Sequence, residues 1–299
     1  MSDFLASPFM HNIFSGLAQG LLYSLVALSL VIIWQSTHVL NFAQGAMAMF
    51  ATYVGMTQID RGVPYWWCVI ISICVGMAFG GLAERVLIRP LYGKPEINPI
   101  VVMVGFLGVI EALAAGIWTG TTRNITSPFS QIYFHASNGQ VILVSPFVIF
   151  QVILAVAIML SIAVLFRFTK LGLQLRASAL APEVARLLGV RVGRMLTIGW
   201  ILASGVGAVA AVIVASGTFG LFPADMDGLF VAGFIAAAVG GLESPIGAIT
   251  GGLLIGLAEQ FILYYWSATL APLGGIIILV VALMIRPQGI FTKNVGRRV

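Results

Sequence analysis

Two carboxamides and a glycine interrupt an otherwise apolar region near residue 40. Asn41 and Gln44 are three residues apart, so they share one face of a helix, and Gly45 follows directly. Carboxamides donate and accept hydrogen bonds without carrying a charge, which suits a brief contact with a polar solute. In a bilayer, such a polar break is tolerated where it is buried in protein or lines a cavity. We expect these residues on a path for polar solutes; the alternative is a turn in which Asn41 caps the next helix.

A second interruption lies at Gly240 and Gly241, between two apolar segments. Interrupted segments in the two halves of a chain point to the path of a transporter. Glu111 lies in the middle of an apolar segment, where a carboxylate costs roughly 2.5–3.5 kcal/mol at the bilayer centre. We expect Glu111 to face such a path or to form a structural hydrogen-bonded pair, and Glu259 to do the same or to reach the membrane surface. Glu84, at a helix end, is expected to extend to the membrane surface.

The composition places these groups in a membrane protein. Of the 299 residues, 60% are hydrophobic and 8% are charged, whereas an average soluble domain carries about 25% charged residues. The net charge of +5 therefore acts as a signal for membrane orientation, and nucleic acid is not an expected partner. The histidines are scattered, and Cys68 and Cys74 are too far apart along a helix for a disulfide. We expect no catalytic residues and no metal site.

The basic residues gather in short stretches between apolar segments, and such stretches stay in the cytoplasm. These stretches are Arg85–Lys94, Arg167–Arg194 and Arg286–Arg298. The clear membrane-spanning candidates are Asn12–Ile33, Trp66–Leu87, Pro99–Trp118, Pro146–Phe166 and Leu196–Ala215. The weaker ones are Leu40–Gln58, Gly228–Gly241, Ile246–Trp266 and Pro272–Ile285. If all basic stretches lie on the cytoplasmic side of the membrane, these segments form an all-α helical bundle with about eight or nine crossings. The N-terminus is then outside and the C-terminus inside. The short segment Gly228–Gly241 alternatively forms a re-entrant half-helix.

Several predicted helices carry Gly-x-x-x-Gly spacing, which lets helix backbones approach closely in lipid. The pairs are Gly16/Gly20, Gly76/Gly80, Gly116/Gly120, Gly247/Gly251 and Gly252/Gly256. We expect them to pack the helices of this chain against one another. A subunit interface is the alternative use of the same spacing.

The long basic stretch, residues 167–194, contains its own predicted helix. Pro182 suits the first turn of a helix and Gly189 suits its end. The helix Pro182–Leu188 would place Val184 and Leu187 on one face, and an apolar face on a short cytosolic helix needs a partner surface. The alternative is that this helix lies on the membrane surface.

Three sets of residues, taken together, match the motifs of a known family. The first set is Gly16, Gln19, Gly20, Tyr23 and the run Val39–Gly45. The second is Gly172, Arg176, Ala177, Ala185, Leu188 and Gly189. The third is Gly240, Gly241, Gly247, Gly251 and Gly252. With these residues the chain resembles the permease subunits of bacterial branched-chain amino acid ATP-binding cassette (ABC) importers. The resemblance covers nearly the whole chain, and Gln44 stands where the family often has a histidine.

The resemblance implies a single transmembrane permease domain over residues 1–299, in a bacterial inner membrane, that moves branched-chain or related amino acids, amides or urea inward. It implies a second homologous permease subunit, two ATP-binding subunits, a periplasmic substrate-binding protein and membrane lipid as partners. It also implies that loop 167–194 contacts the ATPase. The residues assigned to that contact are Gly172, Arg176, Ala177, Glu183, Ala185 and Gly189.

We expect no cofactor on the chain itself, because the 299 residues contain no Gly-x-x-x-x-Gly-Lys-Ser/Thr phosphate loop. ATP would then be bound by the partner subunits. The alternative function is an ion- or proton-coupled secondary transporter, in which Glu111 and Glu259 are the coupling groups. A membrane-embedded enzyme is a third class, and it requires a convergent cluster of reactive residues that the sequence does not indicate.

Overall fold

The computed structural model describes residues 8–95, 97–120, 122–125, 127–129, 134–135, 141–142, 145–217, 220–222 and 225–291. The long helices are α2 (Pro8–Thr37), α4 (Tyr65–Leu82), α5 (Ile97–Trp118), α6 (Pro146–Phe168), α9 (Val192–Ala215) and α11 (Pro245–Tyr265). The shorter helices are α3 (Gln44–Ile59), α7 (Lys170–Leu180), α8 (Pro182–Leu187), α10 (Asp225–Gly240) and α12 (Ala271–Ile285). A π-helix, η1 (Ala83–Ile88), and a 3-10 turn, η2 (Arg89–Leu91), follow α4. Two short strands, β1 (Phe134–His135) and β2 (Val141–Ile142), pair antiparallel.

The predicted all-α membrane bundle is confirmed. Within the described residues, six helices have the length and apolar character to cross a membrane, namely α2, α4 with its extension to Leu91, α5, α6, α9 and α11. Every spanning segment predicted from the sequence coincides with one of these helices or with α3, α10 or α12. The segment suspected of being re-entrant forms the regular 16-residue helix α10. Such a helix is about 24 Å long, somewhat less than the ~30 Å hydrocarbon core, and the number of full crossings stays a prediction.

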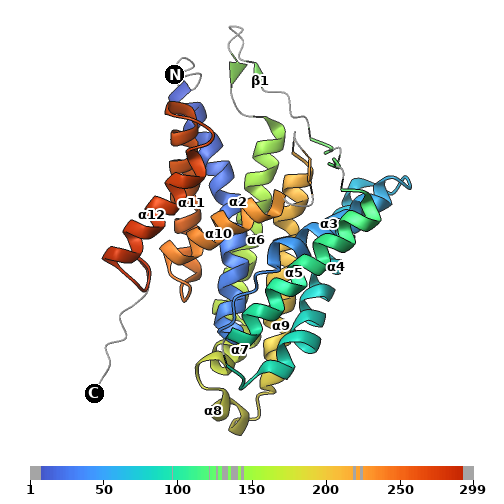
Figure 1. The fold of residues 1–299 in the computed structure, drawn as a ribbon, viewed down its shortest axis with the longest axis vertical. Coiled ribbons are helices and arrows are strands. Elements are labelled where there is room, and N and C mark those ends of the chain that lie inside the picture. The colour runs from blue at the N-terminus through green and yellow to red at the C-terminus, as the bar shows by residue number, and fades with distance from the viewer. Residues whose placement is uncertain are drawn as a thin grey trace.

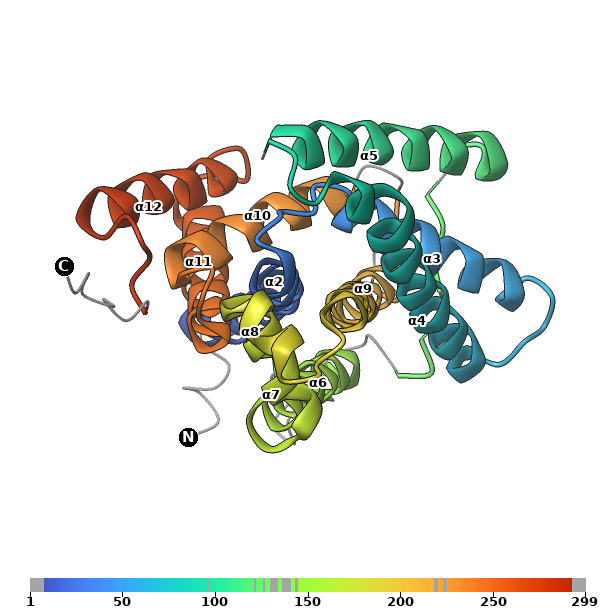
Figure 2. The same cartoon turned by 90° about the horizontal axis from the view of Figure 1, so that it is seen from below.

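Helix α2 forms the centre of the bundle (Figure 2). It packs against α11, α9 and α10, while α4 packs against α9 and α3. Helix α2 is almost wholly buried, whereas α5 and α6 leave most of their apolar surface uncovered. Figure 1 shows β1 and the α7–α8 pair at opposite ends of the molecule, with α2 starting at the β1 end. The basic α7–α8 segment and the strand pair therefore lie on opposite sides of the bundle, as the threading of the sequence predicts.

Glycines allow α2 and α11 to meet at backbone contact. A Cβ atom on Gly20 would lie 2.9 Å from the carbonyl oxygen of Gly252, and one on Gly256 would overlap the backbone of Gly20. Helix α9 packs just as closely against Gly76 and Gly80 of α4, so a Cβ atom at either position would collide with α9. The expected packing within one chain is therefore confirmed for these pairs. Around Gly116 and Gly120, by contrast, a Cβ atom would meet open space.

The prediction that Glu84 extends to the membrane surface is wrong, because this residue is fully buried within η1. Arg89 Nη2 lies 3.0 Å from its Oε2 atom, Thr197 of α9 donates to the same oxygen at 2.7 Å, and Tyr92 donates to Oε1 at 3.1 Å. A buried carboxylate needs such partners because the loss of its hydration is costly. Burial and the Glu84 carboxylate raise the pKa of the Tyr92 phenol above its ordinary value. The cluster ties η1 and η2 to the start of α9.

We predict that Gly256→Val destabilises the protein by roughly 1–3 kcal/mol, since the added side chain forces α2 and α11 apart. The measurement is thermal unfolding of the purified protein in detergent. The matched control is Gly116→Val, which introduces the same side chain at the same motif spacing into open space. Equal melting temperatures for the two variants would show that backbone contact between α2 and α11 does not limit stability.

Candidate functional site

The break between α2 and α3 is polar, buried and internally hydrogen-bonded. Asn41 is fully buried and Gln44 nearly so. The Asn41 amide nitrogen donates to Gln44 Oε1 at 2.9 Å, and the Asn41 oxygen accepts from the backbone nitrogen of Ala43 at 3.0 Å. The Gln44 amide donates to the carbonyl of Ala203 in α9 at 3.1 Å. The two carboxamides therefore turn the chain and also fasten the start of α3 to α9.

Glycines on both sides make this arrangement possible. A Cβ atom on Gly207 of α9 would lie 2.5 Å from the Gln44 amide nitrogen, so Gly207 provides the space that the Gln44 side chain fills. Gly45 lies against the backbone of Met226 and the Cβ atom of Phe230 in α10. The structure thus brings Asn41, Gln44 and Gly45 together between α9 and α10. Their place on a transport path stays a prediction.

The second predicted break, at Gly240 and Gly241, is a tight turn between α10 and α11. A Cβ atom on Gly240 would overlap the backbone of Gly247, and Gly241 has a φ of +105°. The segment that follows α12 covers this turn, since Ile290 donates its backbone N–H to Val239 at 2.9 Å and Phe291 donates to Gly240 at 3.1 Å. Both glycines are therefore required by the packing, whatever further role they have.

The two carboxylates within apolar helices have different surroundings. Glu259 of α11 accepts a hydrogen bond from the Tyr23 hydroxyl of α2 at 2.6 Å. A Cβ atom on Gly275 of α12 would lie 2.8 Å from the carboxylate, so three helices meet there. Glu111 of α5 lies beside the carboxyl group of Asp227 in α10. Among the described residues, its enclosed Oε1 atom has no hydrogen-bond partner. Glu259 thus contributes to helix packing, and Glu111 belongs to a carboxyl pair whose second member, Asp227, sequence reasoning did not name.

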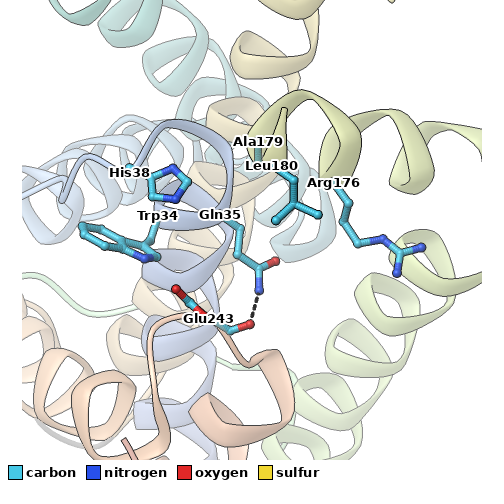
Figure 3. A pocket seen from close by; sticks show the side chains of 7 residues that line it. All are labelled: Trp34, Gln35, His38, Arg176, Ala179, Leu180 and Glu243. Carbon is cyan, nitrogen blue, oxygen red and sulfur yellow. Dashed lines mark hydrogen bonds between the residues drawn. The ribbon is translucent and has the colours of Figure 1, made fainter. Parts of the chain in front are cut away.

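A cavity of about 240 Å³ opens where α2, α7 and the α10–α11 turn meet (Figure 3). It is lined by Trp34, Gln35, His38, Arg176, Ala179, Leu180 and Glu243. A second hollow, of about 670 Å³, shares Gln35, Arg176 and Glu243 and continues between α2, α6 and α11 with largely apolar walls. Sequence reasoning assigned no role to Gln35 or Glu243, because they are distant in sequence and neither belongs to a motif.

The α7–α8 loop has the predicted helix and an uncovered apolar surface. Thr169 caps α7 by accepting from the Gly172 backbone nitrogen at 3.1 Å, and Gly172 touches the backbone of α6 closely. Helix α8 buries Ala185 and ends at Leu187, and Gly189, with a φ of +80°, lies two residues beyond this end. The large apolar side chains exposed on α7, on α8 and directly after α8 are Leu173, Leu180, Val184, Leu187 and Leu188.

The remaining residues assigned to the ATPase contact fall into two places. Glu183 is exposed on α8. Arg176 lines the cavity at the base of the loop, and Ala177 beside it is half-buried. The loop therefore combines an exposed aliphatic tip with a polar base, and the contact itself stays a prediction.

These features define a polytopic membrane permease with a structured loop at one end. Residues 12–285 match the model of a family described as "Branched-chain amino acid transport system / permease component". The chain therefore belongs to this family of ABC transport permeases.

The relatives agree with this family. The high-affinity branched-chain amino acid transport system permease protein LivH of Escherichia coli K12 is 25% identical over 303 residues, covering 95% of this chain and 96% of LivH. BraD of Pseudomonas aeruginosa, a permease protein of the same description, is 27% identical over 300 residues, covering 95% and 96%. The fructose import permease protein FruF of Bifidobacterium longum is 23% identical over 216 residues, covering 70% of this chain and 58% of FruF. These matches support an ABC importer permease over an ion-coupled secondary transporter.

A solved structure shares the fold. PsaBC from Streptococcus pneumoniae, in complex with Fab, superposes with a TM-score of 0.52, covering 92% of this chain and 91% of that chain at 14% identity. The same arrangement of helices is therefore known in an experimental structure.

Proposed function

We propose that the chain forms one half of the membrane channel of an importer for branched-chain or related amino acids. Its partners would be a second homologous permease, two ATP-binding subunits and a periplasmic binding protein, in a bacterial inner membrane. The observation that carries the proposal is the family match over nearly the whole chain, together with the exposed aliphatic tip of the α7–α8 loop. No cofactor is assigned to the chain, since ATP is bound by the partner subunits.

The ATPase contact is placed on the aliphatic tip of α8. Leu187 is 88% exposed and Leu188 is 77% exposed, and a contiguous apolar patch on a water-facing loop marks an interaction surface. Gly172, Ala185 and Gly189 shape the loop, while Glu183 and the neighbouring leucines face the partner. Arg176 and Ala177 join the loop to the bundle.

We predict that Leu187→Asp abolishes or strongly reduces ATP-driven uptake, because a carboxylate cannot be buried in an apolar contact without a partner. The measurement is uptake in vesicles, together with the amount of ATP-binding subunit that copurifies with the permease. Gln174→Asp serves as the control, since Gln174 is exposed on α7 of the same loop. Normal uptake by the Leu187 variant would place the ATPase contact elsewhere.

The polar break at Asn41, Gln44 and Gly45 is proposed as part of the translocation path, with Glu111, Gly240 and Gly241 as further members. Two uncharged carboxamides can exchange hydrogen bonds with a zwitterionic amino acid and release it again. This proposal requires the break to open during the transport cycle, since both side chains are buried and paired in this structure.

We predict that Asn41→Leu and Gln44→Leu reduce uptake per assembled complex while the ATP-binding subunits still copurify. Loss of a buried hydrogen-bond partner also lowers stability, by roughly 1–3 kcal/mol, so uptake is normalised to the amount of intact complex. Asn124→Leu is the control, because Asn124 is exposed between α5 and α6. Two variants with normal normalised uptake would restrict Asn41 and Gln44 to helix packing, and the path would then be sought around Glu111 and Gly240–Gly241.

We further propose that loop 167–194 and the C-terminus are cytoplasmic and that the N-terminus is periplasmic. We predict that cysteines introduced at Ala177 and Asn124, in a background without Cys68 and Cys74, react with an impermeant thiol reagent from opposite faces of the membrane. Labelling is measured in intact cells and in inverted vesicles. Reaction of both positions from one face would overturn the proposed orientation.

A further inference from the structure

Two arginines from different helices line the hollow of about 670 Å³ that adjoins the smaller cavity. Arg167 lies in the last turn of α6, and Arg176 lies on α7. The ion pairs among the described residues involve other arginines, so neither arginine of the hollow has an acidic partner there. Two guanidinium groups that line one hollow repel each other, and an anion bound between them removes this repulsion.

Glu243 also lines the hollow, but its carboxylate is directed away from Arg176. Figure 3 shows the Arg176 guanidinium on one side of Gln35 and the Glu243 carboxylate on the other. His38, which lines the smaller cavity, lies on the Glu243 side. Arg176 Nε donates to the Gly172 carbonyl at 3.4 Å, and within the described part of the chain its terminal nitrogens have no acceptor. The hollow therefore has a cationic side with donors left for an anion.

The polar and apolar residues of the hollow are separated along the length of the bundle. The polar ones lie at the end that carries the α7–α8 loop, and they are Gln35, Arg167, Arg176 and Glu243. From that end, apolar side chains line the hollow for about two turns of α2 and α6, or ~10 Å, toward the interior of the long helices. They include Leu28 and Ile32 of α2, Met159, Ile162 and Ala163 of α6, and Ile246 and Ile249 of α11. Ile246 is 70% exposed, so this apolar wall is open to the surroundings of the bundle.

We propose that this hollow binds one anionic phospholipid. Its phosphate lies between Arg167 and Arg176, and an acyl chain runs along the apolar wall formed by α2, α6 and α11. A guanidinium presents paired N–H donors that fit phosphate oxygens, and basic pockets between membrane helices suit anionic headgroups. A free phosphate has the same charge but leaves the apolar wall uncovered. The separation of charged from apolar lining along the bundle matches an amphiphile and favours the lipid.

The bound lipid would join the loop to the bundle. Arg176 belongs to α7, at the base of the loop that carries the proposed ATPase contact, and Arg167 belongs to the long apolar helix α6. A phosphate that contacts both guanidinium groups holds α7 against the end of α6. The inference depends on the membrane setting of the chain and not on its cargo, so it is tested separately from the proposed function.

The test is native mass spectrometry of the full-length protein in neutral detergent, titrated with phosphatidylglycerol and phosphatidylcholine that have the same acyl chains. Both lipids carry a phosphate, and only phosphatidylglycerol has a net negative charge. Wild-type protein should bind phosphatidylglycerol about fivefold more tightly, as expected for two arginines partly offset by Glu243 near an anionic headgroup. Arg167→Gln/Arg176→Gln should lose this preference. Arg186→Gln/Arg194→Gln, which removes two exposed charges outside the hollow, should keep it.

A second variant tests the apolar wall. Ala163→Trp places a large side chain in the hollow and should weaken phosphatidylglycerol binding, again by about fivefold, without changing any charge. Ala157→Trp, at an exposed position of α6 outside the hollow, should bind this lipid like the wild-type protein. Thermal unfolding without added lipid should be the same for the two tryptophan variants, so that a difference in binding reports on the hollow.

Two results with the lipids would overturn the proposal. One is equal affinity of the wild-type protein for both lipids, and the other is loss of the preference in the Arg186→Gln/Arg194→Gln control. Inorganic phosphate and glycerol 3-phosphate are also titrated, because they share the charge of the headgroup. If either displaces phosphatidylglycerol in a manner that depends on Arg167 and Arg176, while Ala163→Trp leaves lipid binding unchanged, the site takes a soluble phosphate and the lipid is excluded.

Discussion

Close contact between the backbones of α2 and α11 is the constraint from which the rest of the structure follows. In lipid, apolar side chains gain little from leaving their surroundings, so helices associate through tight packing and hydrogen bonds. Gly20 and Gly256 allow that packing, and Gly251 lets α10 approach α11 in the same manner. With α2, α10 and α11 at such short separation, the α10–α11 turn must be tight. Its position beside the end of α2 lets Gln35 reach the Glu243 carbonyl, and this contact shapes the cavity at the base of the α7–α8 loop.

Buried polar groups then connect this core to the helices around it. Gln44 joins α3 to the middle of α9 through Ala203, and the Glu84–Arg89 cluster joins η1 to the second turn of α9 through Thr197. Helix α9 begins five residues after α8 ends. Helix α8 is thus joined by a short segment to α9, which carries both polar connections. The loop is thus linked to the polar break by a continuous helix.

Sequence patterns predicted the elements well and the long-range polar contacts poorly. Hydropathy, together with Pro182 and Gly189, located the helices and the loop because these signals are local. The partner of Glu84 was missed, since the π-helix η1 turns this side chain inward toward Arg89 and α9. The cavity was missed because Gln35, Arg176 and Glu243 meet only in the folded chain. The Gly-x-x-x-Gly spacing alone also did not show which glycine pairs pack against another helix. Gly252/Gly256 packs against α2, whereas Gly116/Gly120 faces open space.

The polar break at Asn41 and Gln44 and the Glu84–Arg89 cluster differ in the free energy needed to open them. Asn41 and Gln44 already satisfy each other, so a solute must exchange their hydrogen bonds for its own. Such an exchange between neutral groups costs little, because the net value of one hydrogen bond is about 0.5–1.5 kcal/mol. The Glu84–Arg89 pair is different, since separating a buried carboxylate from its partner leaves an uncompensated charge. Neutral carboxamides are therefore suited to the proposed path, which requires the break to open, and the charged cluster is suited to a contact that stays closed.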